Sequence, residues 1–350
     1  MKQKHNTVTN IDCSEIITAI QTPALVKAGK LRGGHPVMNG IRPVMYAGGY
    51  CLVIPYVVGG HKYAVRCWFS GLDGMEERAG KISSALKASG LPYFASYEFV
   101  REGLATSQGV VPIVIMDWID AQPLKDWIAE HLGDANAILE LARRFVRMVS
   151  DLHENGIAHG DLQHGNILVR PDGSLMLVDY DSMYVPQLKR YAAEIAGIRG
   201  YQHPDRDRLK TLSPKMDYFS ELVIYTSLRA IAAQPSLWNE LEIGGSETLV
   251  FSGEDLDSRG RAPIFGRLGG IPGLKGLVDE MKSELRKHSI CDLRPLEDII
   301  DGKAGGLVAP VPQGSNWLDK IRDGWKRIPS HAGPGYSSSD VALVRSGWKR

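Results

Sequence analysis

The sequence predicts an α+β fold in which a strand-rich region comes first and a larger, mainly helical region follows. Short apolar runs rich in β-branched residues alternate with glycine turns between residues 41 and 119. Apolar residues then recur at helical spacing, most clearly over residues 137–155. At 350 residues the chain is long enough to form one large domain or two lobes around a substantial core.

Composition and charge exclude several classes of function. The apolar content of 43% and charged content of 23% are those of an ordinary globular protein. A net charge of +1 predicts no binding to nucleic acid or a membrane surface, and no apolar run approaches the roughly 20 residues of a membrane helix. The basic N-terminus lacks the apolar core of a signal peptide, and the four cysteines lack metal-ligand spacing. We therefore expect free thiols and a cytoplasmic location.

Patterns along the chain predict four regions, at residues 1–40, 41–119, 120–303 and 304–350. The first is a polar extension with a short helix, expected to pack on the region that follows, and the last is a Gly-, Pro- and Ser-rich tail. In the second region we expect strands at 44–47, 50–54, 63–68, 92–100 and 111–116, with one helix at 73–87. In the third we expect helices at 123–130, 137–155, 217–233, 274–288 and 291–300.

Residues able to support chemistry gather just after the 137–155 helix. Asp161 is followed five residues later by Asn166 and a short apolar strand, and the next apolar strand ends in Asp179. A plain hairpin is the alternative, because Asp and Asn are common in turns and Asp172-Gly173 is by itself a turn signal. Carboxylate and amide oxygens at the ends of adjacent strands are also the ligands that Mg²⁺ prefers.

Five landmarks in the right order resemble the protein-kinase superfamily over residues 41–301. The run 159–166 resembles the catalytic loop, 179–181 the metal-binding triplet, 201–205 the end of the activation segment, 217–225 the helix below the catalytic loop, and 294–300 the last helix. The resemblance implies a bilobal fold, with a small antiparallel sheet lobe carrying one helix and a larger, mainly helical lobe. The runs HGDLQHGN, VDYD and YQHP are similar to a bacterial branch of serine/threonine kinase-like proteins. That branch is often encoded beside von Willebrand A-type proteins and metal-dependent phosphatases, which implies these as partners.

The activity that the resemblance implies is ATP- and Mg²⁺-dependent phosphoryl transfer to Ser or Thr of a protein substrate. Asp161 is the implied catalytic base, and Asn166 and Asp179 are the implied metal ligands. The implied nucleotide-binding residues are Gly48 and Gly49 in a glycine turn over the phosphates, Val53, Ala64, Met116 and Leu168 around adenine, Asp117 and Trp118 at the hinge, and Arg66 with Glu77 at the phosphates.

Four positions depart from the family pattern. Arg66 stands in place of the strand lysine, and the two cations differ in reach and geometry. Gly160 replaces the arginine that reads a phosphorylated activation loop, so we expect no control by phosphorylation of that loop. Gln163 replaces a lysine that assists the γ-phosphate, and Asp181 replaces a glycine.

The resemblance also predicts two ion pairs. Arg66 is expected to face an acid of the 73–87 helix, with Glu77 preferred to Glu76. Asp205, at the end of the activation segment, is expected to pair with Arg294 of the last helix.

Two other functions remain open on the sequence alone. The cation changes at Arg66 and Gln163, with Asp181, also suit a nucleotide-binding pseudokinase that acts as a scaffold, since catalytic power depends on charges around the phosphates. The glycine at position 160 also occurs in small-molecule kinases such as aminoglycoside phosphotransferases, although these lack the features seen at 201–205 and 217–220. Fold alone does not fix the substrate.

Overall fold

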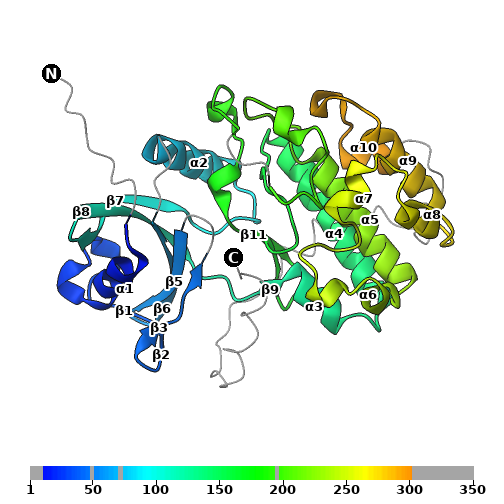
Figure 1. Cartoon of the computed structure of the whole chain (residues 1–350). Coiled ribbons are helices and arrows are strands. Elements are labelled where there is room, and N and C mark those ends of the chain that lie inside the picture. Colours follow the sequence, from blue (N-terminus) through cyan, green and yellow to red (C-terminus); the bar gives the residue numbers. More distant parts are fainter. Residues whose placement is uncertain (1–10, 48–50, 70–73, 194–196, 302–350) are drawn as a thin grey trace.

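The fold has two lobes, one built on a β-sheet and one built mainly of helices (Figure 1). The structure, a computed structural model, describes residues 11–47, 51–69, 74–193 and 197–301. The predicted α+β bilobal architecture is confirmed. Gly48, Gly49 and the tail from residue 302 lie outside the described residues.

The small lobe is organised around a six-stranded antiparallel sheet with the order β1-β5-β6-β8-β7, in which β4 also pairs with β5. The strands are β1 (His35–Pro36), β4 (Tyr46–Ala47), β5 (Cys51–Val58), β6 (His61–Trp68), β7 (Glu98–Thr106) and β8 (Gly109–Asp117). A short hairpin of β2 (Met38–Asn39) and β3 (Arg42–Pro43) projects beside it.

Alternation of side chains along the strands gives the sheet two apolar faces. Val65 and Cys67 of β6 pack on one face with α1 (Cys13–Gln21), whereas Trp68 packs on the other with α2 (Met75–Ser89). Residues predicted as an N-terminal extension therefore supply a helix and strand β1 to the small lobe. The boundary expected at residue 41 falls inside this lobe.

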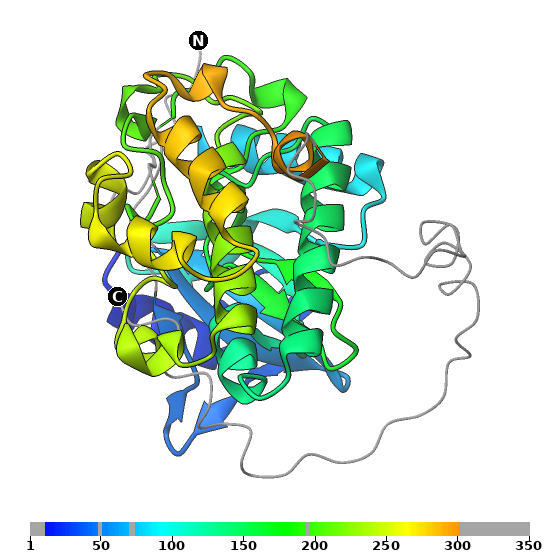
Figure 2. The ribbon, with the colours of Figure 1, turned by 90° about the vertical axis from the view of Figure 1, so that its right-hand side faces the viewer.

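The large lobe is built around two long helices that lie side by side, α4 (Ala135–Glu154) and α5 (Tyr218–Ala233) (Figure 2). Shorter helices surround them: α3 (Leu124–Glu130), α6 (Leu237–Glu240), α7 (Gly253–Asp257), α8 (Pro263–Gly269), α9 (Lys275–Leu285) and α10 (Leu296–Asp301). Among the described residues, no helix has the length and apolar character needed to cross a bilayer.

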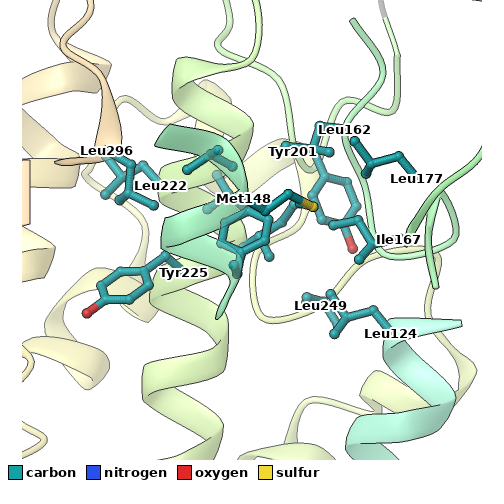
Figure 3. Close-up of a cluster of buried hydrophobic side chains, with 14 of the residues drawn as sticks. Leu124, Met148, Leu162, Ile167, Leu177, Tyr201, Leu222, Tyr225, Leu249 and Leu296 are labelled. Carbon is teal, nitrogen blue, oxygen red and sulfur yellow. The ribbon is translucent and has the colours of Figure 1, made fainter. Parts of the chain in front are cut away.

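A small sheet at the junction of the lobes carries the chemistry-bearing turns. Its strands β9 (Gln122–Pro123), β10 (Ile167–Val169) and β11 (Leu175–Leu177) have the order β11-β10-β9. Figure 3 shows Ile167 and Leu177 packed near Met148 of α4 and Tyr201. The backbone N–H of Leu177 also donates to the Tyr93 carbonyl at 2.8 Å. The small sheet is thus fixed both to the helical core and to the chain entering β7.

A buried charged cluster ties the last described helix to the lobe. The ring of His153, near the end of α4, lies 2.8 Å from Glu221 Oε1 of α5 and 2.8 Å from Glu297 Oε1 of α10. The Glu221 side chain is only 2% exposed. Burial by itself would lower the pKa of His153, but hydrogen bonds to the two carboxylates raise it to about 10. The imidazolium therefore compensates buried negative charge.

We expect His153→Ala to lower the free energy of unfolding by about 3–5 kcal/mol, because Glu221 is left buried without its cation. The folded pKa of about 10 lies above the roughly 6.5 of an unfolded histidine. The difference in free energy of unfolding between wild type and variant is therefore largest below about pH 6.5, and it shrinks as the pH rises through about 10.

Urea unfolding at a series of pH values measures this difference. Arg143→Ala, which removes an exposed ion pair with Glu140 on the same helix, is the control and should change stability by no more than about 0.5 kcal/mol. A His153→Ala effect below about 1 kcal/mol, or one that grows toward alkaline pH, would contradict the proposed role.

Candidate functional site

The loop that follows α4 is held from below by Asp217, the residue just before α5. Its carboxylate accepts hydrogen bonds from the backbone N–H groups of His159 and Gly160, the latter at 2.9 Å. The His159 ring Nε2 lies 2.8 Å from the Val178 carbonyl oxygen. The loop is therefore fixed both to the core helix and to the strand that leads into Asp179.

Asp161 and Asn166 meet at the two ends of this loop. The Asn166 side-chain Nδ2 donates to the Asp161 carbonyl at 2.8 Å and to its carboxylate Oδ2 at 3.3 Å. The backbone N–H of Val178 donates to the Asn166 carbonyl at 3.0 Å, which places Asp179 one residue beyond that contact. Burial raises the pKa of Asp161, His159 opposes that rise, and the charge on Asp179 adds to it. The structure thus brings together the three residues predicted to carry the chemistry.

Asp179 adopts a backbone conformation that few non-glycine residues take, with φ 67° and ψ 72°. The following Tyr180 is fully buried, and its hydroxyl donates to the Leu177 carbonyl at 2.7 Å and accepts from the Ala95 N–H at 3.0 Å. These contacts fix the turn, so the strained conformation is maintained by its surroundings.

Arg66 is clamped between two carboxylates of this turn. Its Nη1 donates to Asp179 Oδ1 at 2.9 Å and its Nη2 to Asp181 Oδ2 at 2.6 Å, and the Arg66 side chain is 6% exposed. The Trp68 indole N–H also donates to Asp181 Oδ2, at 3.4 Å. Burial opposes ionisation of Asp179, but Arg66 outweighs it and lowers the pKa of that carboxyl. We call Arg66, Asp179 and Asp181 the arginine clamp.

The predicted pairing of Arg66 with Glu77 is wrong. The Glu77 side chain is 65% exposed and lies 2.6 Å from Lys81 Nζ on its own helix, while Glu76 pairs with Arg101. The reason is the extra carboxylate of Asp181, which occupies the second guanidinium nitrogen of Arg66.

Helix α2 reaches the same turn through a residue that sequence reasoning missed. Arg78 donates from Nε to the Asp181 carbonyl at 2.9 Å and from Nη2 to the Met183 carbonyl at 3.3 Å. Its targets are backbone oxygens, and such contacts leave no signal in side-chain spacing.

The residues predicted to surround adenine lie along the sheet and the strand below it. Ala64 of β6 stands opposite Met116 of β8, and Val53 of β5 stands opposite Arg66. Val53, Ala64 and Leu168 are partly buried, and Met116 is buried.

Two backbone N–H groups of the predicted hinge already donate hydrogen bonds within the protein. The backbone N–H of Asp117 donates to the Ser96 hydroxyl at 3.0 Å, and that of Trp118 donates to the Lys62 carbonyl at 3.1 Å. The Lys62 ammonium also lies 3.9 Å from the centre of a Trp118 ring. A purine edge would therefore have to use carbonyl oxygens of this stretch or the N–H of Ile119.

The residues near Asp179 suit Mg²⁺ in their chemistry. Because the Asn166 NH₂ group is used by Asp161, the amide oxygen is the end turned away from Asp161. This oxygen and the Asp179 carboxylate are hard ligands, and Mg²⁺ commonly takes one or two such groups together with phosphates and water. Within the described ranges no group of three His, Cys, Asp or Glu side chains could hold a metal ion. An ion bound here would therefore complete its coordination with phosphate and water oxygens.

The predicted pair of Asp205 with Arg294 is also wrong. Asp205 Oδ2 accepts from Arg259 Nη2 at 2.7 Å, and Arg294 instead binds Glu284 of α9. Arg259 follows α7 with a positive φ of 51°, which directs its guanidinium to Asp205 and to the Leu285 carbonyl. The acid is buried and paired as expected, but the arginine comes from an unpredicted turn.

Gly160 occupies a position that only glycine can fill. Its φ is +84°, and a Cβ built on it would lie 2.2 Å from the Ser182 carbonyl oxygen and 2.6 Å from Met216 Cε. The buried Arg206 reaches the Gly160 carbonyl with Nη2 at 3.4 Å. The loop is therefore packed tightly against Ser182, Arg206 and Met216.

Gly160→Ala is expected to lower the free energy of unfolding by at least about 2 kcal/mol, because the left-handed conformation and the contact with Ser182 both penalise a Cβ. Gly133→Ala is the matched control, since a Cβ there meets nothing within 4 Å and the backbone is not left-handed. Urea unfolding of both variants checks this, and equal stabilities would contradict the tight packing at Gly160.

Comparisons with known proteins agree with this geometry. Residues 99–240 match the family described as the protein kinase domain. The serine/threonine-protein kinase PAK 1 of Mus musculus is 26% identical over 129 residues, which cover 36% of this chain and 23% of the relative. The serine/threonine-protein kinase STE20 of Eremothecium gossypii is 25% identical over 152 residues, which cover 41% of this chain and 15% of the relative. PknB of Mycobacterium leprae, also a serine/threonine-protein kinase, is 24% identical over 123 residues, which cover 33% of this chain and 19% of the relative.

The matched region contains the loop, the triplet and α5, but not Arg66 or the glycine turn. The chain spans less than a quarter of the length of these curated relatives. Two lobes joined at a small sheet, a loop carrying Asp161 and Asn166, and the match to the kinase domain agree with one another. Together these findings support membership of the protein-kinase superfamily.

Proposed function

We propose that this chain is a protein kinase that transfers the γ-phosphate of ATP, with Mg²⁺, to Ser or Thr of a protein substrate. The observation that carries the proposal is the convergence of Asp161, Asn166 and Asp179 at two adjacent turns, each fixed by the core. Phosphoryl transfer depends mainly on positioning and charge neutralisation, which such a rigid set of oxygen groups supplies.

Each of these residues has a role that follows from its chemistry. Asp161 accepts or orients the proton of the attacking hydroxyl, and its raised pKa suits a base. Asn166 and Asp179 hold the metal through oxygen atoms. When bound, Mg·ATP supplies the transferable phosphoryl group and the cation that neutralises its charge. Arg66 reaches the phosphates only after leaving the arginine clamp.

Contacts around Gly160 support activity without phosphorylation of the activation segment. No side chain is present at this position to read a phosphate, and the loop is already held by Asp217 and Arg206. The conformation that a phosphate would otherwise stabilise is built into the packing.

A protein partner and a cytoplasmic setting complete the proposal. The bacterial branch that the motifs resemble implies von Willebrand A-type proteins and metal-dependent phosphatases as partners. All four cysteines, Cys13, Cys51, Cys67 and Cys291, are free thiols, which supports a reducing compartment. The net charge of +1 gives no basis for nucleic acid or membrane partners.

One observation favours a second candidate, a nucleotide-binding scaffold without catalysis. Arg66 is buried and both of its terminal nitrogens are bound to carboxylates, so the cation is withdrawn from any phosphate. One of these carboxylates belongs to Asp179, the proposed metal ligand. A chain in which the clamp persists would bind nucleotide without positioning its phosphates for transfer.

Incubation of the full chain with Mg²⁺, labelled ATP and a mixed pool of Ser- and Thr-containing peptides should give labelled peptide. Asp161→Ala should lower the rate at least about 100-fold, because the hydroxyl loses the group that accepts its proton. Asp279→Ala, which changes an exposed acid on α9, is the control and should transfer at the wild-type rate.

The alternatives give different results in the same assay. A rise in Tm with Mg·ATP but no transfer to peptide, to the chain itself or to water would establish the scaffold. Labelling of an aminoglycoside or sugar but of no peptide would point to a small-molecule kinase. Transfer unaffected by Asp161→Ala would overturn the assigned base.

A further inference from the structure

The turn that follows Asp179 has carbonyl groups that need partners from elsewhere in the protein. Residues Tyr180–Ser182 form a single 3₁₀ turn, in which the Met183 N–H donates to the Tyr180 carbonyl at 3.1 Å. The last carbonyl groups of a helical segment have no partner within that segment. Asp179, immediately before the turn, has the strained φ of 67°, which persists only where the surroundings hold it. The position of the proposed metal ligand therefore depends in part on the groups that bind these carbonyl oxygens.

Arg78 of α2 supplies two of the donors. Its Nε donates to the Asp181 carbonyl at 2.9 Å and its Nη2 to the Met183 carbonyl at 3.3 Å. A planar guanidinium presents its N–H groups in a fixed fork, so two acceptors bound at once are held at a fixed spacing. The Arg78 side chain is partly buried, between Trp68 and Tyr97 of the sheet. Arg78 thus holds the end of the turn from the side of the small lobe.

Arg78 also balances charge at the turn. Asp179 and Asp181 bring two negative charges, and Arg66 supplies one positive charge. The guanidinium of Arg78, held at the Asp181 backbone, supplies a second. Its hydrogen bonds end on carbonyl oxygens, so neither a phosphate nor a metal ion at the Asp179 carboxylate competes for them. Arg78 can therefore hold the turn after Arg66 has moved to the phosphates.

Helix α2 is a rigid support for this contact. Its residues Ala79, Ile82 and Leu86 are buried in the core of the small lobe. The Ser83 hydroxyl donates to the Tyr97 carbonyl at 2.5 Å, which fixes the helix to the chain that enters β7. Because the helix is anchored in this way, the hydrogen bonds of Arg78 restrict where the turn can lie.

We propose that Arg78 is a positioning residue, which holds the turn at 180–183 and thereby keeps the Asp179 carboxylate where the metal binds. This inference rests on the proposed kinase function and adds to it a residue of α2 that acts through Asp179. Arg78 itself touches no reacting atom. In its absence we expect the turn to open more often and Asp179 to bind the metal less well.

Hydrogen exchange of the full chain without nucleotide tests the contact with the turn. Arg78→Met keeps the aliphatic stem of the side chain and removes both hydrogen bonds. Peptides that contain the Met183 amide should exchange about ten-fold faster than in wild type, because the turn that protects this amide opens more often. Arg101→Met removes an exposed ion pair with Glu76 of the same helix and is the matched control, which should exchange like wild type.

A magnesium titration tests the effect on Asp179. At a fixed ATP concentration, the Mg²⁺ concentration that gives half of the rise in Tm should be several-fold higher for Arg78→Met than for wild type. In the transfer assay kcat should fall about ten-fold while the KM for the peptide stays the same. Arg78→Lys keeps the charge and one donor nitrogen, so it should recover part of both losses. A residue that only stabilises the fold would lower Tm without changing the Mg²⁺ requirement.

The outcomes separate this inference from the proposed function. An unchanged Mg²⁺ requirement in Arg78→Met overturns the inference, whether or not the turn exchanges faster. If wild type shows no rise in Tm with Mg²⁺ and ATP and no transfer, the kinase proposal fails, and faster exchange in Arg78→Met would still support Arg78 as the residue that holds the turn. Should Arg78→Met not fold, Arg78→Lys takes its place, and it should shift the exchange rate and the Mg²⁺ requirement in the same directions.

Discussion

The bridge between Arg66 and the two carboxylates of Asp179 and Asp181 is the interaction on which the rest of the site depends. It joins the central strand of the small lobe to the turn that carries the proposed metal ligand. Arg66 is buried and its two partner carboxylates are partly buried, and the desolvation cost of these charges is offset by their mutual attraction and hydrogen bonds. Loss of any one would leave the others uncompensated, so the lobes are held in register by a structure that tolerates little change.

The clamp also explains the placement of α2. In this chain the helix does not offer an acid to the strand cation; Arg78 binds the carbonyls of Asp181 and Met183, the same turn that receives Arg66. Lys81 of α2 adds a hydrogen bond to Tyr191 at 2.7 Å. Sheet, helix and turn therefore form one connected unit. If a nucleotide draws Arg66 away as proposed, the turn at Asp179 loses one of its fixed contacts, and phosphate binding is then coupled to the position of the proposed metal ligand.

The sequence pattern predicted the helices, the strands and the loop that carries Asp161, because these features depend on residues close to one another in sequence. The helical spacing at 137–155 and the Asp161-to-Asn166 interval are short-range features, and both appear as α4 and as the loop closed by Asn166. The partners of charged groups depend instead on segments distant in sequence. The partner of Asp205 is therefore Arg259 and not the predicted Arg294, and Arg66 pairs with Asp181 and not with Glu77.

Helix α1 was expected to pack on the strand-rich region, and its buried residues Ile16, Ala19 and Ile20 do so. Gln202 lies in the 201–205 run that resembled the end of the activation segment, but no role was predicted for its side chain. Its buried amide has no hydrogen-bond partner among the described residues, which becomes visible only when burial and hydrogen bonds are known.

The arginine clamp is tested most directly by a crystal structure of the full chain with Mg²⁺ and a non-hydrolysable ATP analogue. We expect the Arg66 guanidinium to leave Asp181 and contact phosphate oxygens, while the Asp179 carboxylate and Asn166 ligate the metal. A bound nucleotide with Arg66 still hydrogen-bonded to both carboxylates would contradict the competition between clamp and phosphates, and with it the proposed role of Arg66 in catalysis.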